Sequence, residues 1–373
     1  MKLTKRLSAA LAGLVSAFFI GAIASAADPS TYSAADFAKV PKIDTHVHLA
    51  GDLPKFMERA AADDFRMLAI NVNYGDFPAL DVQQRDAIRL MRTYPERIAW
   101  AATFDAHDSE SPGWLARTQK HLDEAFAQGA VGVKVWKDIG MSWRDKDGRV
   151  VLIDDARFAP IFSNLEKRGI VLLAHQAEPR NAWLPLDQMT IEGDRSYFRE
   201  HPQYHMANHP EWPGYDELLA ARDRMLAQHP KLEFVGVHLA SIEWDVDRLS
   251  AWMRAHPQAN VDLAARLVHL ELQSVKARDK VRAFFVEFQD RILYGTDLSR
   301  GHGQSDAAFA EDAHAAWLAD WAFLAGGGPL KSNDFEGEFS GLALPRAVID
   351  KVYGANARRL FPTAWRGTAH AKD

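Results

Sequence analysis

The sequence predicts an α/β protein with the architecture of a closed (β/α)8 TIM barrel. Three observations support this: short apolar runs rich in β-forming residues, amphipathic segments between most of them, and a total of eight such units in 373 residues. Strands that alternate with helices pair in parallel through βαβ crossovers. Eight units favour a closed barrel over an open doubly wound sheet, and a barrel of this length forms a single domain.

Each predicted strand is a short, nearly continuous hydrophobic run, as expected for a parallel sheet that is covered by helices. The runs occupy residues 43–48, 67–73, 98–104, 131–136, 170–175, 234–239, 260–264 and 292–297. Apolar residues with helical spacing fill most of the intervals, at 81–94, 113–128, 158–168, 215–228 and 272–288. Strand and helix therefore alternate along most of the chain.

Two segments extend this barrel. Between strands five and six, residues 177–216 form a long insertion rich in Pro, Trp, His and Arg. Because loops of this length inside a compact domain usually serve function, we expect a lid or substrate wall there. After strand eight, Gly-rich stretches at 301–303 and 326–328 lead to a C-terminal helical extension that ends near Phe361, and residues 363–373 are expected to form a flexible tail.

Residues 1–26 have the pattern of a secretory signal peptide. Lys2, Lys5 and Arg6 precede an apolar run that extends to about Ala24, and the Ala-Ser-Ala that ends at Ala26 fits a cleavage site. An uncleaved membrane anchor is the alternative, because the apolar run approaches the length of a spanning helix. We expect cleavage, a barrel over residues 27–362, and export to the periplasm or the exterior without a stable membrane anchor.

Composition excludes several classes of function. The chain has no cysteine, which excludes disulfides, thiol nucleophiles and Cys-ligated metals. A net charge of −6 without basic clusters gives no support for nucleic-acid binding. Gly-x-Ser-x-Gly, phosphate-loop and dinucleotide signatures are absent from the sequence. A metal in this chain must therefore be held by His, Asp, Glu or Lys.

Polar residues at the predicted strand ends indicate one catalytic site, because barrel active sites lie at the carboxyl ends of the strands. His46 and His48, two residues apart on strand one, project from the same face and can grip one divalent metal. Strands four, five, six and eight carry one further polar residue each, which are Lys134, His175, His238 and Asp297. Burying such groups is costly, so their coincidence favours a catalytic centre over a solute-binding or degenerate barrel.

This constellation resembles the amidohydrolase superfamily, and most closely its amidohydrolase-related branch (amidohydrolase 2). The resemblance covers residues 40–362 and is carried by the segments 44–48, 132–136, 174–176, 236–238, 294–297 and 354–360. It implies that His46, His48, His175 and Asp297 bind a catalytic divalent metal. Lys134 matches a position that, in binuclear members, is carboxylated and bridges two metals, and His238 matches a second-metal ligand or a catalytic acid or electrophile.

The number of metals, one or two, therefore stays open. Zinc is the default expectation, although His and Asp ligands also suit manganese, iron or cobalt. A bound metal lowers the pKa of a coordinated water towards about 7. We expect Asp297 to move the proton of that water and His238 to polarise the substrate carbonyl, which makes these two the predicted catalytic residues. Asp44 is expected either to orient the histidines or to be a structural carboxylate.

The expected reaction is the hydrolysis of a small cyclic or acyl substrate, which is an amide, a lactone or an ester. Arg266, together with Arg180 or Arg300 from the loops, is predicted to bind a substrate carboxylate, with a surface ion pair as the alternative for each. Trp136 and Trp183 are predicted to stack on a substrate ring, with simple packing as the alternative. The insertion adds three histidines as lid residues, of which the second or third is expected to reach substrate: His201, His205 and His209.

A metal-dependent decarboxylase is the alternative reaction, because the branch that the chain resembles contains both activities. The same ligand set serves either reaction, so the sequence does not separate them. The expected partner is a small-molecule substrate, and the sequence leaves the oligomeric state open, with a homodimer as one option.

Overall fold

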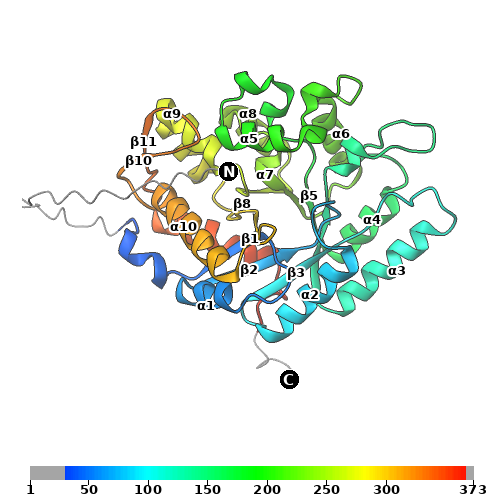
Figure 1. The fold of residues 1–373 in the computed structure, drawn as a ribbon, viewed down its shortest axis with the longest axis horizontal. Helices are drawn as coiled ribbons and strands as arrows, with labels where there is room; N and C mark the ends of the chain where they lie inside the picture. Colours follow the sequence, from blue (N-terminus) through cyan, green and yellow to red (C-terminus); the bar gives the residue numbers. More distant parts are fainter. Residues whose placement is uncertain (1–29, 367–373) are drawn as a thin grey trace, which may run out of the picture.

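The computed structural model describes residues 30–366 and shows a parallel sheet curled into a barrel, with helices on its outside (Figure 1). The strand order is β8-β7-β6-β5-β4-β3-β2-β1-β9. The strands are β1 Lys42–His48, β2 Phe65–Ile70, β3 Ile98–Thr103, β4 Ala130–Val135, β5 Val171–Ala174, β6 Phe234–Gly236, β7 Ala259–Asp262, β8 Ile292–Leu293 and β9 Leu298–Ser299.

The predicted eighth strand closes the barrel as two short pieces. β8 pairs with β7, and β9, five residues further along, pairs with β1. Between these pieces the contact with β1 continues, since Thr45 N donates to Tyr294 O at 2.9 Å and Asp297 N donates to His46 O at 2.8 Å. The predicted TIM barrel is therefore confirmed, and the break in strand eight turns the Asp297 side of the segment towards the barrel mouth.

The helices connect successive strands. Their bounds are α1 Pro54–Ala62, α2 Leu80–Thr93, α3 Trp114–Ala127, α4 Ala159–Arg168, α5 Glu192–Glu200, α6 Tyr215–Gln228, α7 Val237–Ala240, α8 Val246–Ala255, α9 Leu267–Glu287, α10 Asp306–Leu324, α11 Arg346–Asp350 and α12 Asn356–Leu360. Helix α10 is an addition to the predicted elements, and it lies beside α1 (Figure 1). It begins at Ser305, whose hydroxyl accepts a hydrogen bond from Ala308 N at 3.2 Å, and it ends before the glycines at 326–328.

The C-terminal segment plugs the barrel from below. After the turn η7 Lys351–Ala355 and helix α12, Phe361 and Trp365 pack with apolar side chains that point into the barrel, such as Leu68, Ala101 and Leu173. The indole of Trp365 also donates to Met67 O at 2.9 Å. The predicted flexible tail therefore begins too early: Ala364 and Trp365 belong to the packed core, while residues 367–373 lie outside the described residues.

The insertion between β5 and β6 is a compact set of short helices. It contains η3 Arg180–Trp183, η4 Leu186–Gln188, α5, η5 Pro202–Tyr204, η6 Met206–Asn208 and the start of α6. The first turn of α5 is held by the loop between β10 Pro329–Lys331 and β11 Glu338–Ser340, because Asp334 accepts hydrogen bonds from Glu192 N at 2.9 Å and Gly193 N at 2.8 Å. This contact ties the insertion to the opposite side of the barrel mouth.

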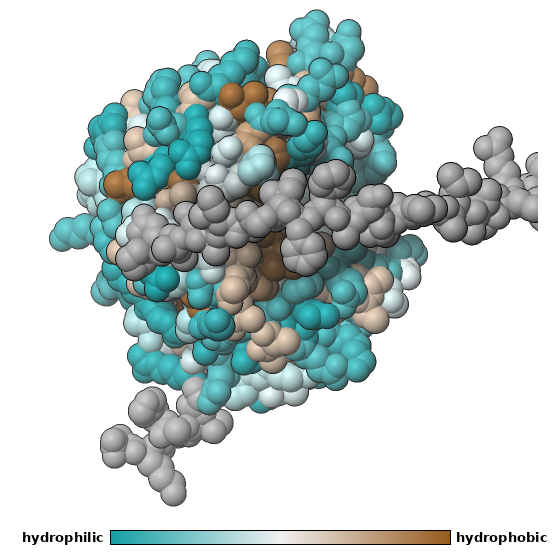
Figure 2. All heavy atoms as spheres, turned by 90° about the vertical axis from the view of Figure 1, so that its left-hand side faces the viewer, coloured by the Kyte–Doolittle hydropathy of each residue, from teal (hydrophilic) through white to brown (hydrophobic). Residues whose placement is uncertain are grey.

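The outer surface of the described residues is largely polar. The face on the left of Figure 1 is mostly hydrophilic, with apolar residues in scattered groups (Figure 2). Among residues 30–366, the exposed large hydrophobic side chains are Trp244 and Leu318, and no helix combines the length and the apolar character needed to cross a bilayer. The predicted signal peptide at 1–26 lies outside the described residues, and the predicted homodimer stays a prediction.

Candidate metal centre and catalytic pocket

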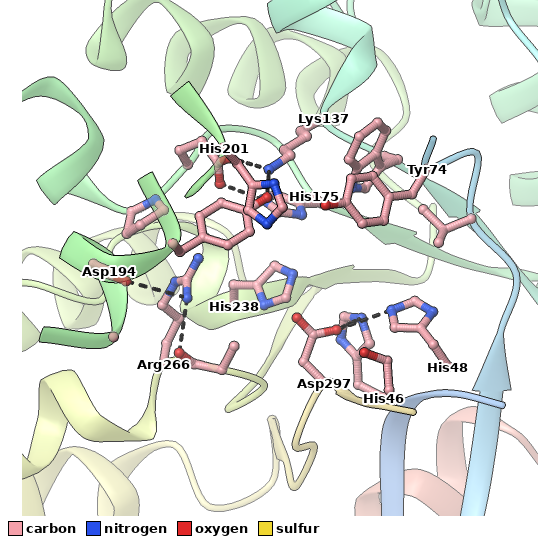
Figure 3. A pocket seen from close by; sticks show the side chains of 18 of the residues that line it. His46, His48, Tyr74, Lys137, His175, Asp194, His201, His238, Arg266 and Asp297 are labelled. Carbon is pink, nitrogen blue, oxygen red and sulfur yellow. Dashed lines mark hydrogen bonds and ion pairs between the residues drawn. The ribbon is translucent and has the colours of Figure 1, made fainter. Parts of the chain in front are cut away.

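A pocket of about 560 Å³ opens at the carboxyl ends of the barrel strands. It brings together eight of the predicted site residues, from five different strand ends and the loop after β7, whereas Arg180, Trp183, His205 and His209 lie outside its lining. Figure 3 shows His46, His48 and Asp297 gathered at one side, with His238 between them and Arg266. The predicted residues in the pocket wall are His46, His48, Lys134, Trp136, His175, His238, Arg266 and Asp297.

Three of the pocket histidines use Nδ1 to hold their rings in place. The Nδ1 of His46 donates to Asp262 Oδ2, that of His48 to Ile70 O, and that of His238 to Ala264 O, each at 2.8 Å. Because a carboxylate or a carbonyl oxygen can only accept, these contacts place the proton on Nδ1 in each ring. In the neutral form, each Nε2 therefore carries a lone pair, which is the form that binds a metal.

Asp297 lies among these lone pairs. Its Oδ1 is 3.1 Å from His48 Nε2 and 3.3 Å from His46 Nε2. Although burial acts to raise the pKa of Asp297, its electrostatic interactions with His46, His48 and His238 outweigh that effect and hold the pKa well below its usual range. A carboxylate and two imidazole lone pairs repel one another unless a proton or a metal cation lies between them.

This donor set fits a divalent cation. One ring nitrogen of His46, one of His238 and a carboxylate oxygen of Asp297 all lie within 4.8 Å of one another. Burial lowers the pKa of His46 and lowers that of His238 well below its usual value, so both rings stay neutral at pH 7. Neutral imidazoles and an ionised carboxylate are the ligands that zinc and similar metals prefer.

His175 and Lys134 complete the expected ligand positions. The Nε2 of His175 is buried and has no hydrogen-bond partner, with Glu178 Oε2 at 3.6 Å, so it is free to act as a ligand. The Nζ of Lys134 lies 3.2 Å from His46 Nε2, and burial lowers its pKa to about 8. Carboxylation of a lysine requires its neutral amine, and the position next to His46 Nε2 is suited to a bridging ligand.

His238 is presented by a strained turn. Strand β6 ends at Gly236, earlier than the predicted boundary at 239, and residues 238–241 have positive φ values of 60°, 57°, 53° and 57°. Each L-residue in this left-handed region costs roughly 1–2 kcal/mol. The turn is held from outside the pocket by Arg222, which donates to Ala240 O, and by the hydroxyl of Ser241, which donates to Ala177 O at 2.7 Å. Positive φ values recur at Ala177, Ala265 and Asp297, so backbone strain gathers around the pocket.

Asp262 is a functional residue that the sequence analysis missed. It is fully buried at the end of β7, where Oδ2 accepts from His46 Nδ1 and Oδ1 accepts from His238 N at 2.6 Å. Asp44 accepts from backbone nitrogens of His46 and Thr296, from the Thr296 hydroxyl and from the Trp317 indole, so it holds strands rather than imidazole rings. The available signal for Asp262 was a carboxylate in a predicted buried strand.

A buried ion pair forms the opposite wall of the pocket. Lys137 donates to Glu178 and, at 3.1 Å, to the hydroxyl of Tyr197. The ammonium also lies 4.0 Å from the centre of the Tyr204 ring. Trp136 lines the pocket beside this pair, 5.1 Å from the ring of Tyr74. The wall is therefore aromatic, and its lysine is already neutralised by Glu178.

The predicted substrate-binding residues divide into two groups. Arg266 lines the pocket, and its nearest carboxylate is Asp194 at 4.0 Å, so its guanidinium is available to an anion. Arg180 is outside the pocket lining because its guanidinium lies 5.4 Å over the ring of Tyr215, where Trp183 also packs. The prediction of Arg180 as a pocket residue is therefore wrong in position.

The histidines of the insertion also differ from expectation. His201 lines the pocket, whereas His205 donates from Nε2 to Leu184 O at 2.8 Å and His209 stacks on Trp212 at 4.0 Å. The expectation that His205 or His209 reaches substrate fails because both rings are engaged inside the insertion.

Comparison with known proteins agrees with this geometry. A family model described as Amidohydrolase matches residues 43–363. A comparison with curated proteins gave no match. Among solved structures, an uncharacterized TIM-barrel protein from Bordetella bronchiseptica has a TM-score of 0.52 at 15% identity, covering 88% of this chain and 100% of that one.

Two structures of a 2,6-dihydroxybenzoate decarboxylase are also similar. The enzyme in complex with 2,6-dihydroxybenzoate has a TM-score of 0.50 at 16% identity, and a structure from Rhizobium has a TM-score of 0.49 at the same identity. Each covers 87% of this chain and 99% of its own. At this level of identity the likeness concerns the fold.

Proposed function

This chain belongs to the amidohydrolase family, and on that premise we propose that it is a metal-dependent hydrolase of a small acyl or cyclic substrate: an amide, an ester or a lactone. The observation that carries the proposal is the convergence of His46, His48 and His238 lone pairs on the Asp297 carboxylate. His175 and, if carboxylated, Lys134 would join the ligand set. Zinc is the proposed metal, with one ion or two.

A divalent metal at this position supplies Lewis acidity, which lowers the pKa of a coordinated water towards about 7. The chain supplies the proton transfer. Asp297, whose pKa is held low, is ionised and can accept the proton of the attacking water. As the water oxygen bonds to the acyl carbon and the bond to the leaving oxygen or nitrogen breaks, Asp297 returns that proton to the leaving atom.

His238 fits a ligand role better than a donor role. Its Nδ1 proton is committed to Ala264 O, so a neutral ring offers a lone pair to the pocket. Polarising a substrate carbonyl would need a second proton on Nε2, which burial opposes by lowering the pKa. Its predicted part as an electrophile therefore applies only to a protonated His238.

Metal content and metal-dependent hydrolysis test the proposal together. The protein is purified without chelators, its metal content per chain is measured by plasma mass spectrometry, and hydrolysis is followed on a panel of small esters, amides and lactones. We expect at least one metal per chain, loss of both metal and hydrolysis in His46→Ala, and recovery of hydrolysis when chelated wild type is given zinc. Wild-type hydrolysis that survives complete metal removal would contradict the proposal.

Decarboxylation is the second candidate, and one observation favours it. Arg266 has no carboxylate closer than 4.0 Å and faces an aromatic wall, which suits a planar substrate acid. Reactions run in ¹⁸O-labelled water separate the two activities. Hydrolysis incorporates label into the acid product, whereas decarboxylation releases carbon dioxide and leaves the organic product unlabelled at its carboxylates.

Export of this activity to the periplasm or the exterior remains part of the proposal, and it rests on the sequence of residues 1–26. Edman sequencing of the mature N-terminus checks it: cleavage predicts a first residue of Ala27, whereas an anchored protein keeps the apolar run.

A further inference from the structure

A second cavity of about 540 Å³ lies directly beside the catalytic pocket. The two cavities share three lining residues, which are His48, Phe77 and Ser299. The ring of Phe77 lies 5.0 Å from that of His48 and 5.0 Å from that of Tyr74, so it forms part of the partition. A substrate bond held at His48 and Asp297 therefore lies at the boundary of two spaces of similar size.

The second cavity has an available cation. Arg300 lines it, is exposed, and makes one long hydrogen bond, of 3.5 Å, to Asp52 O. The carboxylate of Asp52 is bound by Arg89. Within residues 30–366 no carboxylate lies within 4 Å of the Arg300 guanidinium, whereas the neighbouring Arg89 pairs with both Asp52 and Asp86.

The two carboxylates that line this cavity have other partners and make no ion pair with Arg300. Asp306 accepts hydrogen bonds from Lys55 N at 2.6 Å and Phe56 N at 3.0 Å, at the start of α1. Asp76 lies 4.0 Å from His201, which lines the catalytic pocket. His302 and the glycines at 301 and 303 form the rest of the loop next to Arg300, which leaves room for a polar group.

We propose that the second cavity is a subsite for the second arm of an acyclic substrate, and that this arm carries a carboxylate bound by Arg300. The inference rests on the proposed hydrolysis, because two arms are needed only where the scissile bond has a substituent on each side. The first arm would lie in the catalytic pocket, where Arg266 faces it. The favoured substrate class is thus a linear ester or amide with an acidic group on both sides of the bond.

This assignment narrows the proposed function. A lactone occupies one cavity and leaves the other without a role, and carbon dioxide released by decarboxylation needs no subsite of this size. Phe77 would fit between the arms, against the bond that is cleaved.

Binding of linear dicarboxylates to the metal-loaded protein tests the subsite without relying on catalysis. Isothermal titration calorimetry compares the α,ω-dicarboxylates from succinate to sebacate with monocarboxylates of equal length. We expect one dicarboxylate length to bind about tenfold more tightly than its monocarboxylate, because a guanidinium–carboxylate pair is charge-assisted. Arg300→Ala should remove that advantage and leave the monocarboxylates unchanged, and Arg300→Lys should retain part of it.

Arg85→Ala is the matched control, since Arg85 is an exposed arginine of α2 that pairs with Asp81 and lines neither cavity. Equal binding of mono- and dicarboxylates at every length, or an advantage that survives in Arg300→Ala, would overturn the subsite. Arg300-dependent binding in a protein that hydrolyses no ester or amide would leave the subsite intact and refute the hydrolysis. Hydrolysis without any Arg300-dependent gain in dicarboxylate affinity would support the hydrolysis and refute the subsite.

Discussion

Replacing Asp262 with asparagine should weaken metal binding without emptying the site of ligands. Asp262 does not line the pocket. Its Oδ2 accepts a hydrogen bond from His46 Nδ1 at 2.8 Å, and its Oδ1 accepts one from His238 N. An asparagine can keep the bond to His238 N with its carbonyl oxygen. Its amide nitrogen then faces His46 Nδ1 and donates, which forces the proton of His46 onto Nε2.

The size of the effect follows from that tautomer change. A His46 with a proton on Nε2 has no lone pair for a metal, so binding must first reverse the tautomer and break the new hydrogen bond. Partners that orient metal-binding histidines contribute about 10–100-fold in affinity, which corresponds to roughly 1.4–2.7 kcal/mol. We therefore expect the zinc dissociation constant of Asp262→Asn to rise by that factor, measured by competition with a chromophoric chelator.

Asp320→Asn is the control for this experiment. Asp320 is also buried and accepts a hydrogen bond from the Tyr294 hydroxyl at 2.6 Å, but it contacts none of the proposed ligands. Its zinc affinity should match that of the wild type. An unchanged zinc affinity in Asp262→Asn, or an equal loss in Asp320→Asn, would refute the reasoning that Asp262 sets the tautomer of His46.

Three further predictions concern stability. Glu178→Gln leaves Lys137 buried without its ion-pair partner and should lower the free energy of unfolding in urea by about 3 kcal/mol. The double variant Lys137→Met/Glu178→Leu should recover most of this loss. A double variant as unstable as the single one would contradict the role of the pair. Burial, with Asp320 and Asp334 nearby, raises the pKa of Glu271 to about 8. Its contribution is therefore complete below its unfolded pKa of about 4.3 and is lost as the pH rises through 8. Glu271→Gln should thus be the more stable form at pH 8, by at most about 5 kcal/mol, and equal stability of the two at pH 8 would refute the assignment. Trp365→Ala removes the side chain that fills the barrel floor and should lower the free energy of unfolding by about 3–5 kcal/mol, measured by calorimetry. Trp365→Phe is the milder control. A loss below about 1 kcal/mol in Trp365→Ala would show that the floor is dispensable.

The part of the fold that depends on periodicity was accessible from the sequence. Strands β1 to β7 fall within a few residues of their predicted ranges, because a buried parallel strand must be a continuous apolar run. Helix α10 was missed because apolar residues also occupy its outer face: Leu318 is exposed, whereas Phe309, Trp317 and Phe323 are buried. Trp365 was assigned to a tail because nothing local shows that it fills the barrel floor.

The sequence predicted which residues form the candidate site, but not how their side chains contact one another. Histidines, a lysine and an aspartate at strand ends identified the pocket, since a closed barrel brings all its strand ends to one mouth whatever the side chains in between. The tertiary structure alone decided which groups face one another across it. Asp262 contacts His46, 216 positions away in the sequence. Arg180 lies over the ring of Tyr215, and Arg300 faces the second cavity without an acidic partner. These three arrangements depend on side-chain directions across the barrel. Local sequence determines the strand on which a residue lies, but contacts between distant segments are determined only when the whole barrel has closed.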